Sequence, residues 1–368
     1  MKVLFDYQAF SMQKYGGVSR YYCELTEYLK KIPQVSFNLP VVFSDNVYVK
    51  SATFPKPISL FGSDKYYFGK RLLTGVCNKV NLANSIFYLI NGDYDLFHPT
   101  YYNPYFLNYL KNKPFVLTVY DMIHELYPNY IDANDRTKVN KALLVKRCDK
   151  VIAISENTKK DISKLLDFPK KSIDVVHLAS NLYPLNQPSF MLPSEYILFV
   201  GSRWGYKNFD FFLRSISKIL QKYKNLYLLC VGGGEFSPKE VKLIKTLGVY
   251  SKVKYHFVSD LELGQVYSNA RLFVYPSLYE GFGIPILESF NCNCPVVLSN
   301  TSCFHEVAGK AGVYFDPSDE LGLYNKVLDL LIDDDLCRRH IKLGQNRAKS
   351  FSWAKSASET IKVYKSVL

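Results

Sequence analysis

Short apolar runs alternate along the chain with longer stretches in which apolar side chains recur every three or four positions. The short runs are typical of buried parallel strands, and the longer spacing is typical of amphipathic helices. This alternation predicts an α/β fold with parallel sheets. The predicted strands are residues 2–6, 41–43, 95–99, 115–119, 150–155, 173–177, 196–200, 226–231, 254–258, 272–275 and 295–298. The predicted helices are residues 20–30, 66–90 (interrupted near Gly75), 135–148, 209–222, 320–333 and 335–349, with one more after Ser155 and a last one ending at 368.

A proline-rich stretch without periodicity divides the chain. Residues 182–193 read LYPLNQPSFMLP, which is typical of a linker. A chain of 368 residues is long enough for two domains. We therefore expect one domain in residues 1–182 and a second in residues 190–351.

Two carboxylates follow the predicted strand 272–275. Glu280 precedes Gly281 and Gly283, and we expect a helix from about Pro285 with Glu288 in its first turn. Ligands bind at the carboxyl ends of strands in open α/β sheets, glycines let a backbone approach closely, and a helix start favours phosphate. Diphosphate and hydroxyl groups together describe a nucleotide sugar. The residues alone also permit a structural role for both carboxylates.

Two other loops after predicted strands carry candidate phosphate-binding residues. Gly16 and Gly17 open the helix 20–30, which suits either a phosphate or an ordinary turn. Arg203 and Lys207 follow the strand 196–200 and could clamp a diphosphate, the arginine as a fork and the lysine as a point charge. The alternative is that they are two surface cations.

Ionisable side chains also follow the predicted strand 115–119. Asp121 and His124 stand at a good place for a site, although His124 could equally be a structural histidine. Upstream, residues 65–79 interleave lysine and arginine with aromatic side chains. This stretch is either a solvated face beside a core face or a patch that lies on anionic lipid.

Composition narrows the class of protein. Apolar residues make up 48% of the chain, which excludes a disordered protein, and no run is long enough to span a membrane. The start, MKVLFDYQAF, predicts a strand and not a signal peptide, so we expect a cytosolic protein. The net charge of +13 predicts an anionic partner, but the chain has no nucleic-acid motif.

Metal and dinucleotide sites are not expected. The eight cysteines are scattered and fit reduced thiols, and Cys292, Cys294 and Cys303 lack the spacing of a zinc site. The D-x-D patterns at 93–95 and 333–335 match that of metal-dependent transferases but lie before a strand and between surface helices. Residues 232–234 are three glycines without the full dinucleotide fingerprint.

The segment PSLYEGFGIPILES (276–289) resembles the E-x7-E motif of retaining glycosyltransferases of family GT4, and the following PVVLSNTSCFHEVAGKAGVYFDPSD resembles that family's continuation. The loop at Gly16 is similar to the family's GGxxR loop. The segment around Asp121 is similar to TVHDMIHELFP, with Tyr120 where relatives often have histidine. The resemblance implies a GT-B fold, in which two Rossmann-like domains with parallel sheets face a cleft and the last helix, 352–368, crosses back onto the first domain.

The function that this resemblance implies is transfer of a sugar from a GDP- or UDP-linked donor to an acceptor hydroxyl with retention at the anomeric carbon. No metal or other cofactor is implied. The acceptor would be a glycan or a lipid-linked glycan in surface polysaccharide synthesis, with peripheral contact to the inner face of the membrane. The implied donor-binding residues are Gly16, Gly17, Arg203, Lys207, Gly281, Phe282, Gly283 and Glu288, and the implied catalytic residues are Asp121, His124 and Glu280.

Two alternatives remain open at this point. One is a nucleotide-sugar epimerase or hydrolase on the same fold. The other is a basic non-catalytic protein that binds nucleic acid or membrane, which predicts salt-sensitive binding to polyanions and no affinity for nucleotide sugars.

Overall fold

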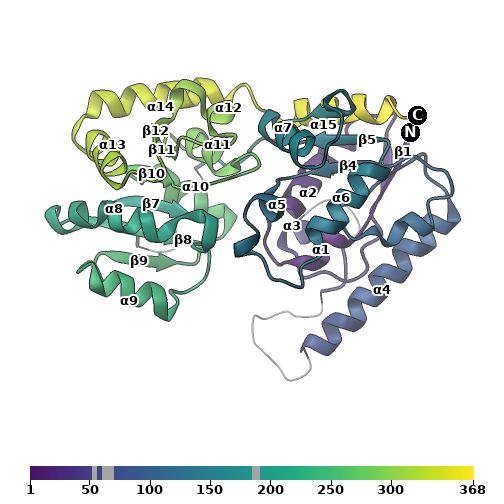
Figure 1. The fold of residues 1–368 in the computed structure, drawn as a ribbon, viewed down its shortest axis with the longest axis horizontal. Coiled ribbons are helices and arrows are strands. Elements are labelled where there is room, and N and C mark those ends of the chain that lie inside the picture. Colours follow the sequence, from purple (N-terminus) through teal and green to yellow (C-terminus); the bar gives the residue numbers. More distant parts are fainter. Residues whose placement is uncertain (52–55, 60–69, 185–190) are drawn as a thin grey trace. The chain divides into compact units, whose positions relative to one another are not determined.

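The computed structural model describes residues 1–51, 56–59, 70–184 and 191–368. These residues form two compact units (Figure 1). Unit 1 contains Met1–Glu125, Ile131–Leu178 and Trp353–Leu368. Unit 2 contains Leu126–Tyr130 and Ala179–Ser352.

Unit 1 is built on two parallel three-stranded sheets with the orders β2-β1-β3 and β4-β5-β6. A single parallel bridge between Phe97 and Phe115 links β3 to the residue before β4. The strands are β1 (Lys2–Phe5), β2 (Ser36–Asn38), β3 (Leu96–His98), β4 (Val116–Val119), β5 (Lys150–Ala153) and β6 (Ile173–Val175). The α-helices are α1 (Gln8–Met12), α2 (Gly17–Leu29), α3 (Val47–Ser51), α4 (Lys70–Asn91), α5 (Ile123–Leu126), α6 (Thr137–Arg147), α7 (Glu156–Leu165) and α15 (Trp353–Lys365).

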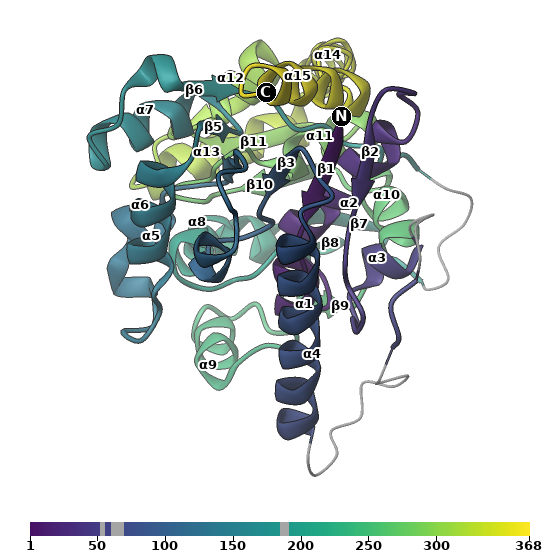
Figure 2. The same cartoon turned by 90° about the vertical axis from the view of Figure 1, so that its right-hand side faces the viewer.

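The last helix, α15, completes unit 1. It packs on α2 and β5, and Trp353 and Tyr364 are buried. The Tyr364 hydroxyl lies 2.6 Å from Nδ1 of His98 at the end of β3, and the Ser356 hydroxyl donates to the carbonyl oxygen of His177. Both ends of the chain therefore lie in unit 1, close together (Figures 1 and 2).

Unit 2 is a six-stranded parallel sheet with the order β12-β11-β10-β7-β8-β9. The chain runs outward from β7 to β9, returns to β10 beside β7, and runs outward in the other direction, so strand order reverses between β7 and β10. The strands are β7 (Glu195–Val200), β8 (Leu226–Val231), β9 (Val253–His256), β10 (Leu272–Tyr275), β11 (Val296–Ser299) and β12 (Val313–Phe315). The α-helices are α8 (Phe209–Lys222), α9 (Pro238–Thr246), α10 (Asp260–Ser268), α11 (Ile284–Asn291), α12 (Phe304–Ala308), α13 (Glu320–Ile332) and α14 (Asp334–Ala348).

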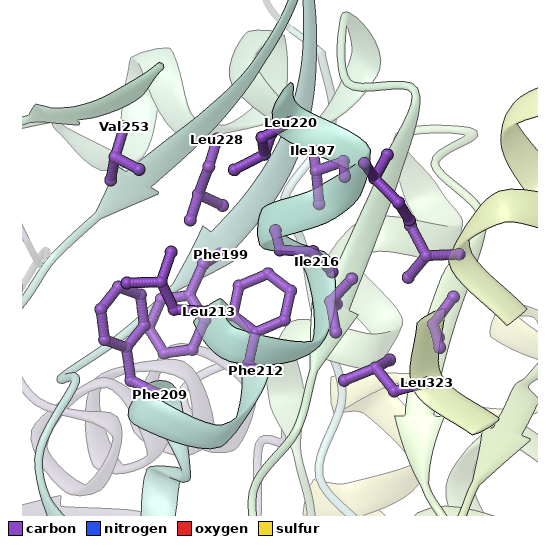
Figure 3. Close-up of a cluster of buried hydrophobic side chains, with 14 of the residues drawn as sticks. Ile197, Phe199, Phe209, Phe212, Leu213, Ile216, Leu220, Leu228, Val253 and Leu323 are labelled. Atoms are coloured by element: carbon purple, nitrogen blue, oxygen red, sulfur yellow. The ribbon is translucent and has the colours of Figure 1, made fainter. Parts of the chain in front are cut away.

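Successive side chains of the central strand β7 project from opposite faces of this sheet. Ile197 and Phe199 pack with α8 in a buried hydrophobic cluster that also receives Leu323 of α13 (Figure 3). On the other face, the Tyr196 hydroxyl donates to the carbonyl oxygen of Val266 in α10 at 2.6 Å. Helices on both faces shield the sheet, so ligand access is left to the loops at the carboxyl ends of the strands.

Most predicted elements match the structure, but two expectations are wrong. The expected strand 41–43 forms only a bridge from Phe43 to Ile58, because Oδ1 of Asn81 accepts hydrogen bonds from the backbone N–H groups of Val42 and Phe43. The second strand is instead β2. Helix α4 is not broken near Gly75, where nothing crowds the helix. Residues 66–69 of the expected helix, and 185–190 of the expected linker, lie outside the described residues.

Candidate functional site

The reversal point of the unit 2 sheet brings two candidate residues together. Lys207 lies in a short 3₁₀ helix (Gly205–Lys207) after β7, and Glu280 lies in the loop after β10. Nζ of Lys207 is 2.6 Å from Oε1 of Glu280, and both side chains are largely buried. The N–H of Leu278 donates to the carbonyl oxygen of Tyr206 at 2.8 Å, which joins the two loops. This is the crevice where α/β sheets of this order bind ligands.

Neighbouring groups hold both the backbone and the side chain of Glu280. The Ser302 hydroxyl and the Cys303 thiol donate to the backbone carbonyl oxygen of Glu280. Burial raises the pKa of Tyr275 well above its ordinary value, and the charge of Glu280 and a hydrogen bond to it raise that pKa further. Tyr275 therefore stays protonated and neutral beside the ion pair.

Glu288 lies deeper in α11 than the sequence suggested. It is the fifth residue of the helix, so the expectation that it stands in the first turn is wrong, because the helix already begins at Ile284. Its side chain is buried, and the Tyr267 hydroxyl donates to Oε2 at 3.3 Å. Burial raises the pKa of Tyr267 well above its ordinary value, and the Glu288 charge adds to this increase.

The loop between the two glutamates has a defined conformation. Gly283 precedes α11 with a φ of 85°, a left-handed conformation that favours glycine. A Cβ there would lie 3.1 Å from the Ile286 side chain. The Phe282 ring is buried and packs edge-on against Phe351 at 5.7 Å between centroids. If Gly281, Phe282 and Gly283 contact the nucleotide sugar, they therefore do so through their backbone atoms.

The Arg203 side chain points inward and forms its hydrogen bonds with other groups of unit 2. Its buried guanidinium pairs with Glu240 at 2.6 Å and donates to the carbonyl oxygens of Gly232, Gly234 and Glu235. Although burial raises the pKa of Glu240, hydrogen bonds with Ser237 and Arg203 lower it overall. Arg203 thus holds the glycine loop after β8, and its contact with a diphosphate stays a prediction.

In unit 1, Gly16 and Gly17 stand at the start of α2. Gly16 is the N-cap residue, has extended backbone geometry and provides no side-chain cap. A Cβ on Gly16 would lie 2.5 Å from the end of the Gln13 side chain, whereas one on Gly17 would meet open space. The backbone is therefore open to close approach at Gly17, whereas the Gln13 side chain already lies against Gly16.

The structure places Asp121 and His124 beside three charged residues that the sequence did not single out, namely Glu125, Asp135 and Lys141. Lys141 of α6 is fully buried, and its Nζ is 2.9 Å from Oε2 of Glu125 and 2.8 Å from the carbonyl oxygen of Asp121. Nε2 of His124 is 3.6 Å from Oδ2 of Asp135. Lys141 belongs to a helix with several lysines, so no sequence signal distinguishes it from its solvated neighbours.

Two buried polar atoms border this cluster. Nδ1 of His124 and Oε1 of Glu125 have no hydrogen-bond partner within the described part of the chain. Burial raises the pKa of Asp135, but hydrogen bonds with Thr137 and the nearby His124 lower it overall. The cluster therefore combines three carboxylates, an imidazole and a buried ammonium group.

Two family profiles match most of the chain. Residues 15–182 match Glycosyltransferase Family 4, and residues 194–333 match Glycosyl transferases group 1. The O-antigen chain mannosyltransferase B of Escherichia coli is 30% identical over 289 residues, 74% of each chain. The chain belongs to glycosyltransferase family 4. A second relative, the O-antigen chain mannosyltransferase RfbU of Salmonella typhimurium, is 32% identical over 57% of this chain and 58% of its own length.

Solved structures agree on the fold of this family 4 glycosyltransferase. Sucrose-phosphate synthase from Thermosynechococcus elongatus superposes with a TM-score of 0.73 at 19% identity, covering 100% of this chain and 98% of that one. HepE from Anabaena, in complex with UDP and glucose, gives 0.73 at 16% identity, covering 99% of both chains. The predicted GT-B class, α/β with parallel sheets in two Rossmann-like domains, is confirmed.

The acidic patterns of this glycosyltransferase have structural partners. Asp93 pairs with Lys2, and the backbone N–H of Lys2 donates to Asp95. Asp333 caps α14, and Asp335 pairs with Arg338 at 2.6 Å. Where the structure describes the chain, no group of three or more potential ligands is placed to hold a metal ion, and no helix is long and apolar enough to cross a membrane.

Proposed function

We propose that this glycosyltransferase moves a mannosyl group from a GDP- or UDP-linked donor to a hydroxyl of a glycan, with retention and without a metal ion. The observation that carries the proposal is the Lys207–Glu280 ion pair at the reversal point of the unit 2 sheet. Its two members offer a cation for a diphosphate and a carboxylate for sugar hydroxyls, side by side. Relatives named as mannosyltransferases support the choice of sugar.

In the proposed reaction, the acceptor oxygen bonds to the anomeric carbon while the bond from that carbon to the diphosphate oxygen breaks. The acceptor proton passes to the departing diphosphate on the same face of the sugar. Lys207 stabilises the negative charge that develops on the leaving group, and Glu280 orients the sugar through its hydroxyls. Glu288 accepts hydrogen bonds from the ribose, and Arg203 supports the site by holding the adjoining glycine loop through the carbonyl oxygens of Gly232 and Gly234.

The proposed acceptor is a lipid-linked glycan of a surface polysaccharide, with Asp121 and His124 on the acceptor side. One relative, from Campylobacter jejuni, is named as an N-acetylgalactosaminyltransferase acting on a diphospho-undecaprenol substrate and is 25% identical over 63% of this chain. The two O-antigen mannosyltransferases support the same setting.

Donor binding tests the assignment. Isothermal titration calorimetry with GDP-mannose, UDP-glucose and the free nucleotides should show one preferred donor. Lys207→Met and Glu280→Gln should each weaken it at least tenfold, or about 1.4 kcal/mol. Glu320→Gln, which breaks the exposed Arg214–Glu320 pair, is the matched control and should bind as the parent does. Parent-like affinity in both site variants would show that the site lies elsewhere.

Turnover assays test the chemistry. The parent should form a glycoside with the anomeric configuration of the donor, at the same rate with and without EDTA. Release of free sugar in place of glycoside would favour the hydrolase alternative. Loss of activity in EDTA, restored by Mg²⁺ or Mn²⁺, would refute metal independence.

We also propose that α4 rests on an anionic membrane. Its outward face carries Leu73, Val76, Val80, Phe87 and Ile90, all exposed and recurring at helical spacing, and the helix extends away from the rest of unit 1 (Figure 2). The net charge of +13 complements anionic lipid, and a lipid-linked acceptor requires access to the membrane surface.

Vesicle sedimentation tests this contact. The parent should bind vesicles that contain phosphatidylglycerol, less so at high salt and less so after Phe87→Ser. Tyr250→Ser changes an exposed aromatic of unit 2 and is the control. Binding unaffected by Phe87→Ser, or a dimer that dissociates in that variant, would contradict the proposal.

A further inference from the structure

Unit 2 contains a cavity beside the proposed donor site. It has a volume of about 480 Å³ and is formed by the loop after β7, the first turns of α8 and α9, and Tyr130. This volume lies within the range of small-molecule sites. Lys207 and Glu280 lie in the loops after β7 and β10, whereas this cavity is lined by the first turns of α8 and α9.

The charges that line the cavity balance one another. Three cationic side chains are matched by three carboxylates, namely Arg203, Arg214 and Lys239 with Asp210, Glu235 and Glu240. Arg203 pairs with Glu240 at 2.6 Å, and Lys239 pairs with Asp210 at 3.2 Å. A phosphate would meet a carboxylate beside each of these cations. Hydroxyl groups, which both donate and accept, fit such a lining better.

Trp204 and the half-buried Tyr130 form one aromatic wall of the cavity. Trp204 is 59% exposed, and its ring meets that of Tyr130 edge-on at 6.0 Å. Tyr130 stacks on Tyr127 at 6.3 Å, and the Tyr127 ring lies 6.4 Å from Tyr206 and 6.1 Å from Tyr279. Trp and Tyr combine an apolar ring face with a polar group, as a ligand with C–H and O–H faces requires.

These five aromatic residues, from Trp204 through Tyr130 and Tyr127 to Tyr206 and Tyr279, form a row that reaches the proposed donor site. The Tyr127 hydroxyl donates to the carbonyl oxygen of Leu278, two residues before Glu280. Nζ of Lys207 is 5.2 Å from the centroid of the Tyr206 ring. In the chain, Tyr127 follows the acceptor-side candidate His124 by three residues. The row therefore connects residues on the donor side to Trp204 and the cavity.

One backbone position holds the row in place. Gly205 has a φ of 59°, which favours glycine, and a Cβ there would lie 3.0 Å from Cγ of Tyr130. The close approach of Tyr130 to this loop thus depends on glycine, and Trp204 is positioned by the same turn.

We propose that the cavity and the aromatic row bind neutral sugar residues of the acceptor glycan, behind the residue that receives the new sugar. The proposal rests on the proposed function, since it assigns the acceptor of that reaction. It makes Trp204 a determinant of acceptor length and leaves donor binding to Lys207, Glu280 and Glu288.

Steady-state kinetics test the role of Trp204. With a saturating donor, Trp204→Ala should raise KM at least tenfold for an oligomannoside acceptor, and leave KM for a single-sugar mannoside and for the donor unchanged. Trp204→Tyr should recover part of the loss, because an aromatic face remains. Phe257→Ala, which removes another exposed aromatic of unit 2, is the control. Parent-like KM for every acceptor in Trp204→Ala would overturn the proposal.

Fluorescence gives a test that does not depend on turnover. The chain has two tryptophans, and Trp353 is 1% exposed, so Trp353→Phe leaves Trp204 as the reporter. Mannotriose without nucleotide should shift and saturate its emission. No response, or a response to GDP that mannotriose competes for, would overturn the proposal. Failure of donor binding in calorimetry would overturn the proposed function, while the mannotriose titration would still decide on the cavity.

Discussion

Lys141 shows what the sequence leaves out at the scale of single residues. Its side chain is fully buried between Glu125 and the backbone of Asp121, and its Nζ lies 5.4 Å from the centroid of the Tyr102 ring. The sequence identified Asp121 and His124 because ionisable residues after a strand are conspicuous. It could not identify Lys141, since a lysine in a basic helix looks the same whether it faces solvent or core.

The buried pair makes a prediction about stability. Lys141→Ala leaves the Glu125 carboxylate buried without its cation, and should lower the free energy of unfolding by about 3–5 kcal/mol. Urea denaturation at pH 7 measures this loss. The double variant Lys141→Met/Glu125→Leu removes both charges and should recover most of it. A single variant as stable as the parent would mean that the pair contributes nothing.

The proposed donor site shows a similar limit. Lys207 and Glu280 were both predicted as candidates, but a pattern of residue types contains no distance between positions 73 apart. Their ion pair and the inward direction of Arg203 follow from how the loops after β7, β8 and β10 fold. The role of each of these residues toward a ligand stays a prediction.

At the scale of elements, strong periodicity predicted position well. Helix α8 and strands β8 and β10 have the predicted bounds, because each has a continuous apolar run or a clear apolar stripe. Strand β2 was missed and α9 was not predicted. The first is short and half-exposed, and its position depends on pairing with β1, which no local pattern contains.

One contact between elements depends on pH. His98, at the end of β3, lies between Thr118 of β4 and Tyr364 of α15, and burial lowers its pKa to about 3. An unfolded histidine titrates near pH 6.5, so below that pH the unfolded chain binds a proton that the folded unit does not. The stability present above about pH 6.5 should therefore fall by about 1.4 kcal/mol per pH unit as the pH drops toward 3.

Urea denaturation from pH 7.5 to 4.5 measures this slope. His98→Gln lacks the titrating group and should give a shallower slope than the parent over this range. His305→Gln, at an exposed position, should keep the parent slope. Equal slopes in the parent and His98→Gln would show that other groups cause the pH dependence.

At the scale of the whole molecule, the chain leaves unit 1 at Leu178 and returns to it at Trp353. Unit 1 therefore lacks a core element until residues 353–368 have been synthesised, whereas the buried cluster of unit 2 is contained within residues 197–330 (Figure 3). The resemblance to the family predicted that the last helix crosses back, but the apolar pattern of that helix cannot show which sheet it covers.

Removal of α15 should therefore affect the two units differently. In a chain that ends at Ser352, trypsin should digest residues 1–178 while a fragment within 191–352 stays protected. A chain that ends at Lys365 keeps α15 and should resist digestion as the parent does. Gel electrophoresis with mass spectrometry identifies the fragments. Equal protection of residues 1–178 in both truncations would show that α15 is dispensable.

The Lys207–Glu280 pair has a consequence for product inhibition under the proposed function. In the proposed site, a nucleoside diphosphate alone would replace Glu280 beside Lys207 and would leave the largely buried carboxylate without that partner. A nucleotide sugar supplies a partner to each charge. The site would therefore hold substrate more tightly than the spent nucleotide, and closing of the ion pair would help to expel that nucleotide after each turnover.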